Sequence, residues 1–150
     1  MQLQNQTRPS KFESVFQEVV VNIVLTSNWC NDQMKQTVGP FDITSQQFNV
    51  LRILRGQHPR ASTINLIKSR MLDKMCDASR IVERLVQKKL VLKKVNYADK
   101  RAVDILISEK GLQLLHQMDA AIDLSAMASA NLTEEEASQL NYLLDKLRDQ

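Results

Sequence analysis

The side chains best suited to recognising a ligand are two arginines, Arg80 and Arg84, which stand four residues apart. Residues at this spacing lie one turn apart on the same side of a helix. A guanidinium group carries five N–H donors in a planar fork, which fits the paired acceptors of a guanine edge or a phosphate. The pair therefore indicates recognition of a nucleic acid. Glu83 beside them favours the alternative, that both are solvated helix arginines.

A second basic group, Asp99-Lys100-Arg101, lies in a polar turn between two runs of apolar residues. In the second run, Val103, Ile105 and Ile107 alternate with other side chains, and a matching run covers residues 90–97. Such alternation on both sides of a turn predicts a β-hairpin. A helix with a basic outer face, followed by a hairpin with a basic tip, is the arrangement with which a winged helix-turn-helix binds duplex DNA.

The helix that carries the arginines is predicted from Ala78, Ile81, Val82 and Leu85, which recur at spacings of three and four. This face is expected to enter a core. The outward side is then formed by Asp73, Cys76, Ser79, Arg80, Glu83, Arg84 and Gln87. Ser79 thus joins the two arginines as a candidate DNA contact.

Four further residues are weaker candidates for DNA contact. Lys93 and Lys94, in the first predicted strand, suit phosphate contacts or a plain surface better than base reading. Ser62 and Thr63 open a short preceding helix, where hydroxyl and backbone N–H groups could meet a phosphate. Helix capping alone would also explain Ser62.

Charge is distributed unevenly along the chain, although the net charge is only +3. Residues 60–101 hold 12 Lys and Arg against 4 Asp and Glu, whereas residues 102–150 hold 3 against 9. The basic part coincides with the predicted helix and hairpin. This coincidence predicts a nucleic-acid footprint on one part of the molecule, with the acidic C-terminal part kept away from phosphate.

Length and composition fit a single domain with an oligomerisation arm, because the chain has 150 residues. Three Gly and three Pro favour long helices, so we expect a mostly α (α+β) fold. No segment resembles a signal peptide or a membrane span, so we expect a cytoplasmic protein without a membrane partner. Cys30 and Cys76 are too few and too isolated to predict a disulfide framework.

Redox, metal and catalytic chemistry have little support in the sequence. Cys76 is predicted on the outward face in the first turn of the basic helix, where the helix dipole could lower its pKa and make it a redox sensor. No neighbouring His or resolving Cys accompanies it, which favours a small residue without a sensing role. His58 and His116 are isolated, so no metal site is expected. Neither a nucleophile with a base nor a Gly-rich phosphate loop is visible, so an enzyme is the weakest hypothesis and no cofactor is expected.

Capping signatures predict where the other helices begin. A first helix follows Ser10-x-x-Glu13 and runs to about residue 36, a second follows Thr44-x-x-Gln47, and a short third is capped by Ser62. A long fifth helix begins at Ser108, has an apolar stripe that continues through Ala126, and is broken by Asn131. A sixth follows Thr133-x-x-Glu136.

The first and the last two predicted helices are not needed for the DNA-binding core, which we place at residues 40–108. Their apolar stripes must nevertheless be buried, and a second copy of the chain can bury them. We therefore assign residues 10–37 and 109–150 to homodimerisation. The expected interface residues are Phe12, Phe16, Leu140, Leu143, Leu144 and Leu147.

Three stretches resemble motifs of MarR-type (multiple antibiotic resistance regulator) transcription factors. The sequence Asp42-Ile-Thr-Ser-Gln-Gln-Phe-Asn-Val-Leu resembles the L-T-x-x-Q-F-x-V-L start of their second helix. Residues 79–91 are similar to their recognition helix and the strand that follows. Asp99-Lys-Arg matches their D-x-R wing, and residues 105–111 match the L-x-L-T-x-x-G segment beyond it.

This resemblance implies a winged-helix homodimer whose first, fifth and sixth helices form the interface. It places Arg101 at the wing tip for the minor groove and has Asp99 orient the wing. Lys89 stands where the family usually has Gly, so its turn must either adopt a conformation compatible with a side chain or tolerate a modest strain of about 1 kcal/mol.

We expect a transcriptional regulator, a repressor on a pseudo-palindromic operator, released by a small amphipathic or aromatic ligand that enters between the core and the dimer helices. The alternative is a winged-helix module for protein interaction or dimerisation without specific DNA binding. Arg80, Arg84 and Arg101 disfavour this alternative, because acidic residues would be expected there instead.

Overall fold

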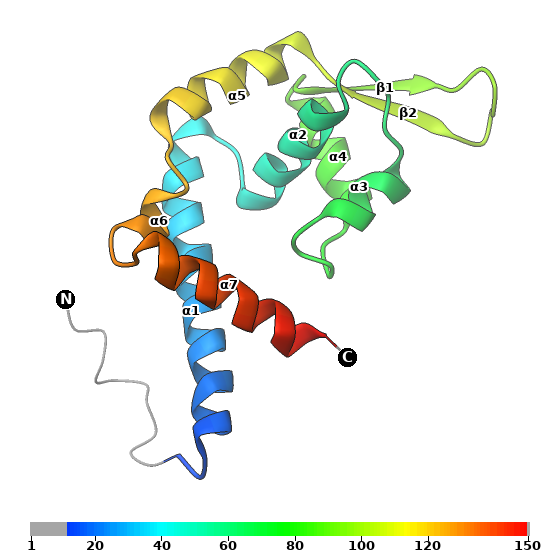
Figure 1. The fold of residues 1–150 in the computed structure, drawn as a ribbon. Coiled ribbons are helices and arrows are strands. Elements are labelled where there is room, and N and C mark those ends of the chain that lie inside the picture. Colours follow the sequence, from blue (N-terminus) through cyan, green and yellow to red (C-terminus); the bar gives the residue numbers. More distant parts are fainter. Residues whose placement is uncertain (1–11, 150) are drawn as a thin grey trace.

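Helix α1 (Val15–Val38) forms a long arm that extends from a compact group of shorter elements, as seen in the computed structural model of Figure 1. The structure describes residues 12–149. After α1 the chain continues through η1 (Gly39–Phe41), α2 (Ser45–Gln57), α3 (Ile64–Arg70), α4 (Ala78–Gln87), β1 (Val91–Val95), β2 (Val103–Ile107), α5 (Glu109–Ala121), α6 (Ala126–Ser129) and α7 (Glu134–Arg148). Within these residues, no helix is both long enough and apolar enough to cross a membrane.

Hydroxyl side chains begin most of the helices. Thr44 forms the predicted capping box with Gln47, and Thr133 forms the one with Glu136. Ser108 caps α5 by accepting a hydrogen bond from the Gly111 N–H at 3.0 Å. The predicted capping box at Ser10 lies outside the described residues; α1 begins at Val15, with Ser14 accepting a hydrogen bond from the Gln17 N–H.

The core lies where α2, α3, α4, α5 and the hairpin meet. Leu51, Ile67, Leu85, Ile105 and Leu115, one from each of these elements, are completely buried. Helix α2 lies at the centre, since it packs against α3, α4, α5 and β2. These elements form the expected winged helix-turn-helix architecture.

Ser62 joins the hairpin to α3 instead of capping the helix. Its N–H donates to the Ile105 carbonyl at 2.8 Å, and the Ile105 N–H donates to the Ser62 carbonyl at 2.8 Å. Thr63 is the cap of α3, because its hydroxyl accepts from the Leu66 N–H. The prediction that Ser62 caps this helix was therefore wrong by one residue.

The wing is a two-stranded antiparallel hairpin that projects from the core (Figure 1), as the alternation predicted. Val91 lies opposite Ile107 at its base, and Val95 lies opposite Val103 near its tip. Only the base is buried, because Val91, Ile105 and Ile107 point into the core while Val95 is exposed. The outer half of the hairpin is thus free to reach a partner.

Helix α5 ends at Ala121, so the prediction of one helix through residue 126 was wrong. Ile122 adopts an extended conformation. The Asp123 carboxylate then accepts hydrogen bonds from the N–H of Ser125 at 2.9 Å and from its hydroxyl at 2.6 Å. This local turn competes with the helical backbone and starts the short helix α6.

Apolar side chains are left exposed on both long terminal helices. Phe16 of α1 is 81% exposed, and Leu140, Leu143 and Leu147 of α7 are about half exposed. Leu144 and Phe12 are partly buried. A single chain thus leaves uncovered the stripes that the sequence assigned to dimerisation.

Candidate nucleic-acid interface

Helix α4 presents the face that was predicted to read DNA. Asp77 caps it by accepting a hydrogen bond from the Arg80 N–H at 3.1 Å. Ala78, Val82 and Leu85 are buried, which leaves Ser79, Arg80 and Arg84 in solvent. Within residues 12–149, neither guanidinium group takes part in an ion pair or a hydrogen bond, so both keep their donors for a ligand.

Cys76 lies outside the helix, in the connection that precedes Asp77, and is partly buried against the core. Burial raises the pKa of the Cys76 thiol, and the neighbouring Asp73 carboxylate raises it further. The expectation of a thiol in the first turn with a pKa lowered by the helix dipole was wrong. A raised pKa lowers the fraction of reactive thiolate and so argues against a redox-sensing role.

The two hydroxyl candidates before α3 have different surroundings. Thr63 is exposed at the helix start, where a phosphate could reach it. Ser62 is 1% exposed, and its hydroxyl oxygen has no hydrogen-bond partner among the described residues. A direct contact between the Ser62 hydroxyl and a DNA phosphate does not fit this burial.

Polar side chains hold the tip of the wing in one conformation. The side-chain oxygen Oδ1 of Asn96 accepts from the backbone N–H groups of Ala98 and Asp99 at 2.9 and 3.0 Å, and its side-chain Nδ2 donates to the Asp104 carboxylate. The Asp99 carboxylate accepts from the Arg101 N–H at 3.0 Å. This arrangement agrees with the orienting role that the resemblance implied for Asp99, and it leaves the Lys100 and Arg101 side chains exposed at the tip.

The two lysines of β1 differ in what they contact. Lys93 reaches back to α4, where its ammonium group forms an ion pair with Glu83. Lys94 forms no ion pair within residues 12–149 and lies across the hairpin from Asp104. Sequence reasoning treated the two lysines as equivalent, and the structure separates them.

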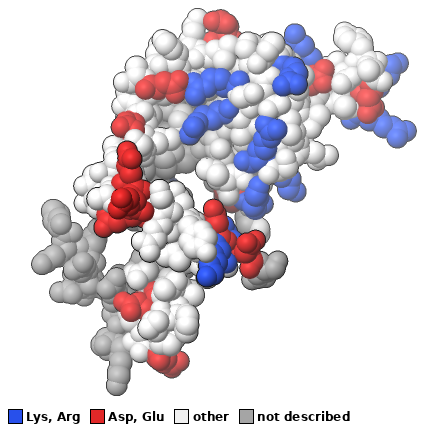
Figure 2. Space-filling model, in the orientation of Figure 1, with Lys and Arg blue, Asp and Glu red and all other residues white. Residues whose placement is uncertain are grey.

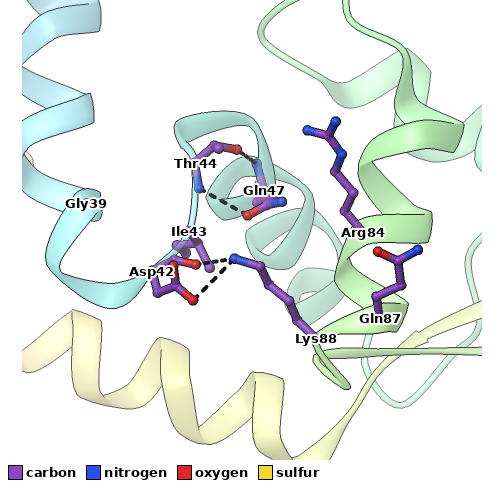
Figure 3. A pocket seen from close by; sticks show the side chains of 8 residues that line it. All are labelled: Gly39, Asp42, Ile43, Thr44, Gln47, Arg84, Gln87 and Lys88. Atoms are coloured by element: carbon purple, nitrogen blue, oxygen red, sulfur yellow. Dashed lines mark hydrogen bonds and ion pairs between the residues drawn. The ribbon is translucent and has the colours of Figure 1, made fainter.

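A groove of about 530 Å³ lies beside α4 on the side away from the wing, and we call it the α2–α4 groove (Figure 3). It is lined by Gly39, Asp42, Ile43, Thr44, Gln47, Arg84, Gln87 and Lys88. At its floor the Lys88 ammonium donates to the Asp42 carbonyl oxygen and lies 3.7 Å from the Asp42 carboxylate. Sequence reasoning missed this groove, because Asp42 and Lys88 are 46 residues apart and only the fold brings them together.

A second cavity, of about 410 Å³, shares Asp42 and Lys88 with the first and opens toward α5. Its other lining residues are Phe41, Leu90, Lys110, Gln113, Leu114 and Gln117. It therefore lies at the junction between the DNA-binding core and the helices that lead to the dimer arm.

Lys89 ends the recognition helix in a left-handed conformation, with φ of 61°. Of the two alternatives left open by the sequence, the structure has the strained one, because a side chain occupies a left-handed position where the family usually has Gly. The Ser108 hydroxyl donates to the Lys89 carbonyl at 2.7 Å and helps to hold the turn. The turn directs the chain from α4 straight into β1, and so fixes the wing relative to the helix.

Figure 2 shows Lys and Arg gathered over the upper part of the molecule, where Figure 1 places α2, α3, α4 and the hairpin. Asp and Glu are interspersed there and are prominent on the opposite, α6-bearing side. No three His, Cys, Asp or Glu side chains among the described residues lie close enough to hold a metal ion.

The chain is 31% identical over 116 residues to the multiple antibiotic resistance protein MarR of Escherichia coli strain K12, covering 76% of this chain and 79% of that protein. The chain belongs to the MarR family. A cysteine-to-serine variant of E. coli MarR, solved in complex with operator DNA, superposes with a TM-score of 0.76 and 27% identity, covering 91% of this chain and 99% of that one. No family model matches the sequence.

A second solved structure shows the same fold at lower identity. The organohalide-sensing regulator RdhR-CbdbA1625, in its 2,4-dichlorophenol-bound form, has a TM-score of 0.80 and 23% identity, covering 99% of this chain and 89% of that one. With the family established, this MarR-type protein is a DNA-binding transcriptional regulator with a winged-helix fold.

Proposed function

We propose that this MarR-family protein is a homodimeric cytoplasmic repressor that occupies a pseudo-palindromic operator and releases it when a small aromatic or amphipathic ligand binds. The observation that carries the proposal is the exposed face of α4, where Arg80 and Arg84 are unpaired among the described residues. An arginine bound to both acceptors of a guanine is the commonest specific contact in the major groove.

The remaining candidate contacts surround this face. In the proposed complex, Ser79 accompanies the two arginines in the major groove, and Arg101 enters the minor groove from the wing tip. Phosphate contacts come from Thr63 at the start of α3 and from Lys94 and Lys100 of the wing. These residues are exposed, and they come from the part of the chain that holds 12 Lys and Arg against 4 Asp and Glu.

Dimerisation follows from the stripes on α1 and α7. Phe16 is 81% exposed, and three leucines of α7 are about half exposed. Apolar stripes of this kind on a soluble protein mark an interaction surface. A two-fold dimer presents two recognition helices to two half-sites about 34–36 Å apart, which matches a pseudo-palindromic operator.

The ligand site that we favour is the cavity of about 410 Å³ next to α5, whose volume is typical of small-molecule sites. Phe41, Leu90 and Leu114 supply apolar contacts there, and Lys110 supplies a positive charge. A ligand in this position could change the angle between the DNA-binding core and the dimer arm. Since RdhR-CbdbA1625 was solved with 2,4-dichlorophenol, phenols and aromatic acids are the first compounds to screen.

Selection of bound fragments from random DNA by the purified protein tests the proposal. We expect a selected sequence with two inverted half-sites, whose centres lie about 10 base pairs apart, and a bound species that contains two protein chains. Failure to enrich any sequence, while the protein remains folded, would support the alternative of a winged-helix interaction module. Loss of binding on addition of a phenolic ligand would then test the release mechanism.

A further inference from the structure

The α2–α4 groove has the lining of a site for a charged group. Six of its eight lining residues are polar or charged, and Arg84 and Lys88 approach it from α4. Two cationic side chains on one side of a groove favour a negatively charged ligand by electrostatic attraction.

Gln47 contributes an amide donor that has no partner among the described residues. The side chain is 4% exposed, and its carbonyl oxygen accepts from the Thr44 N–H at 3.1 Å. This bond fixes the orientation of the amide, so that the Nε2 amide group points toward α4 and into the groove (Figure 3). Within residues 12–149 this N–H₂ group has no acceptor, and it is open to solvent, so it is available to a ligand in the groove.

Lys88 contributes a cation whose present partner is weakly held. Its ammonium group contacts the carbonyl and the carboxylate of Asp42 (Figure 3). The Asp42 side chain is fully exposed, and exposed ion pairs are weak because water screens them. An incoming phosphate could therefore replace the Asp42 carboxylate as the partner of Lys88.

The position of the groove relative to α4 specifies which anion it meets. Glu83 and Lys93 tie one edge of the helix to the wing, and Arg84 and Lys88 form the opposite edge beside the groove. A helix inserted into a major groove about 12 Å wide has a sugar-phosphate backbone on each side. The wing faces one of these backbones, and the α2–α4 groove faces the other.

We propose that the α2–α4 groove binds a backbone phosphate of the operator on the side of α4 opposite the wing, with Lys88 as the cation and the amides of Gln47 and Gln87 as hydrogen-bond donors. Asp42 is then a competitor that must give up Lys88. This inference rests on the proposed function, since it requires that α4 enters the major groove.

Two substitutions remove the contacts while sparing the fold. Lys88→Gln removes the charge and should weaken binding to the selected duplex and to random duplex alike. The slope of the logarithm of the DNA association constant, log K, against the logarithm of the salt concentration should fall in magnitude by about one unit. Gln47→Glu keeps a side-chain oxygen that can accept from the Thr44 N–H in the capping box, and it places a negative charge where the donor was. It should weaken binding more than Lys88→Gln does. Lys35→Gln, in α1 and away from both cavities, is the matched control and should change neither quantity.

A third substitution should act in the opposite direction. Asp42 has a left-handed backbone with φ of 56°, which Asn adopts readily, so Asp42→Asn removes the competing charge without new strain. We expect it to strengthen binding to both duplexes. In a Lys88→Gln background the same substitution should have no effect, because the cation that it frees is absent.

Neutral methylphosphonate linkages, placed one at a time along the selected duplex, locate the phosphate with the wild-type protein. One linkage on the side away from the wing should weaken wild-type binding and leave the Lys88→Gln variant unaffected. If wild type binds the selected duplex but no linkage distinguishes it from Lys88→Gln, or if Asp42→Asn does not strengthen binding, the groove proposal is overturned and the proposed function stands. If wild type binds no DNA, the proposed function itself fails.

Discussion

Lys93 on the wing strand and Glu83 on the recognition helix form an ion pair. The pair links the two elements that are expected to enter neighbouring grooves of DNA. It also neutralises the ammonium charge of Lys93, so this lysine is less available to phosphate than its neighbour Lys94. The two lysines should therefore contribute unequally to DNA affinity.

Lys94→Ala should weaken binding to all duplexes and reduce the slope of log K against log salt by about one unit. Lys93→Ala should reduce the slope less, because that charge is already neutralised by Glu83. Glu83→Gln should release Lys93 and raise the affinity for random DNA. Binding titrations at several salt concentrations measure all three, and equal slopes for the two lysine variants would contradict the expectation.

Arg80→Ala or Arg84→Ala should weaken the selected operator far more than random DNA. A guanine contact by arginine discriminates by about 1–3 kcal/mol, so the ratio of the two affinities should fall by roughly 5- to 150-fold for the arginine that reads the base. Competition titrations with both duplexes give this ratio. An unchanged ratio in both variants would show that α4 is not the element that reads the sequence.

Arg101→Ala should lower affinity, with a sequence dependence confined to the flanks of each half-site. The minor groove distinguishes mainly A·T from G·C pairs and responds to groove width, so the loss should be largest for A·T-rich flanks. Asn96→Ala should have a smaller effect of the same kind, because it removes the bonds that hold the tip but keeps the arginine. Operators with altered flanks test both, and a loss that ignores the flanks would place Arg101 on the backbone.

Deletion of residues 133–150 should convert the dimer into a monomer. It removes Leu140, Leu143 and Leu147, which are about half exposed on the single chain and are expected to be buried against a second copy. Sedimentation gives the oligomeric state, and circular dichroism checks that the core stays folded. The double substitution of Leu143→Ser and Leu147→Ser repeats the test in the full chain. A truncated protein that remains a tight dimer would exclude α7 from the interface.

Cys76 should react slowly. Burial and then Asp73 raise the pKa of its thiol, so the folded state holds this proton more tightly than the unfolded state does. Its contribution to stability is therefore full below the pKa of the unfolded chain and is lost as pH rises through the folded pKa. Alkylation by iodoacetamide in a Cys30→Ser background should be slower than for a free thiol at the same pH. Asp73→Asn should accelerate it, and faster alkylation of the parent protein would contradict the assignment.

Local pattern was enough to predict the recognition helix, the hairpin and the positions of several caps. The face of α4 followed from the spacing of Ala78, Val82 and Leu85, because a buried helical stripe must recur every three to four residues. The unusual turn at Lys89 was indicated by one side chain at a position where glycine is usual, although the sequence alone did not decide between a compatible and a strained conformation.

The features that escaped prediction depend on tertiary contacts or on competition between similar local signals. Ser62 and Thr63 are both hydroxyl residues suited to cap α3, and only the pairing of Ser62 with Ile105 decides between them. The apolar period continues through residue 126, yet the Asp123 carboxylate draws Ser125 into a turn. The α2–α4 groove depends on Asp42 meeting Lys88, which no local pattern records.

The paired hydrogen bonds between Ser62 and Ile105 have a consequence for operator architecture. They fasten the start of α3 to the wing strand, so helix and wing should turn as one rigid body. A protein built in this way cannot adapt to altered DNA by bending the wing alone. One extra base pair at the centre of the operator would rotate the second half-site by about 34°, since B-DNA completes a turn in about 10.5 base pairs. We therefore expect little tolerance for insertions between half-sites, so that genomic binding sites for this regulator share one fixed spacing.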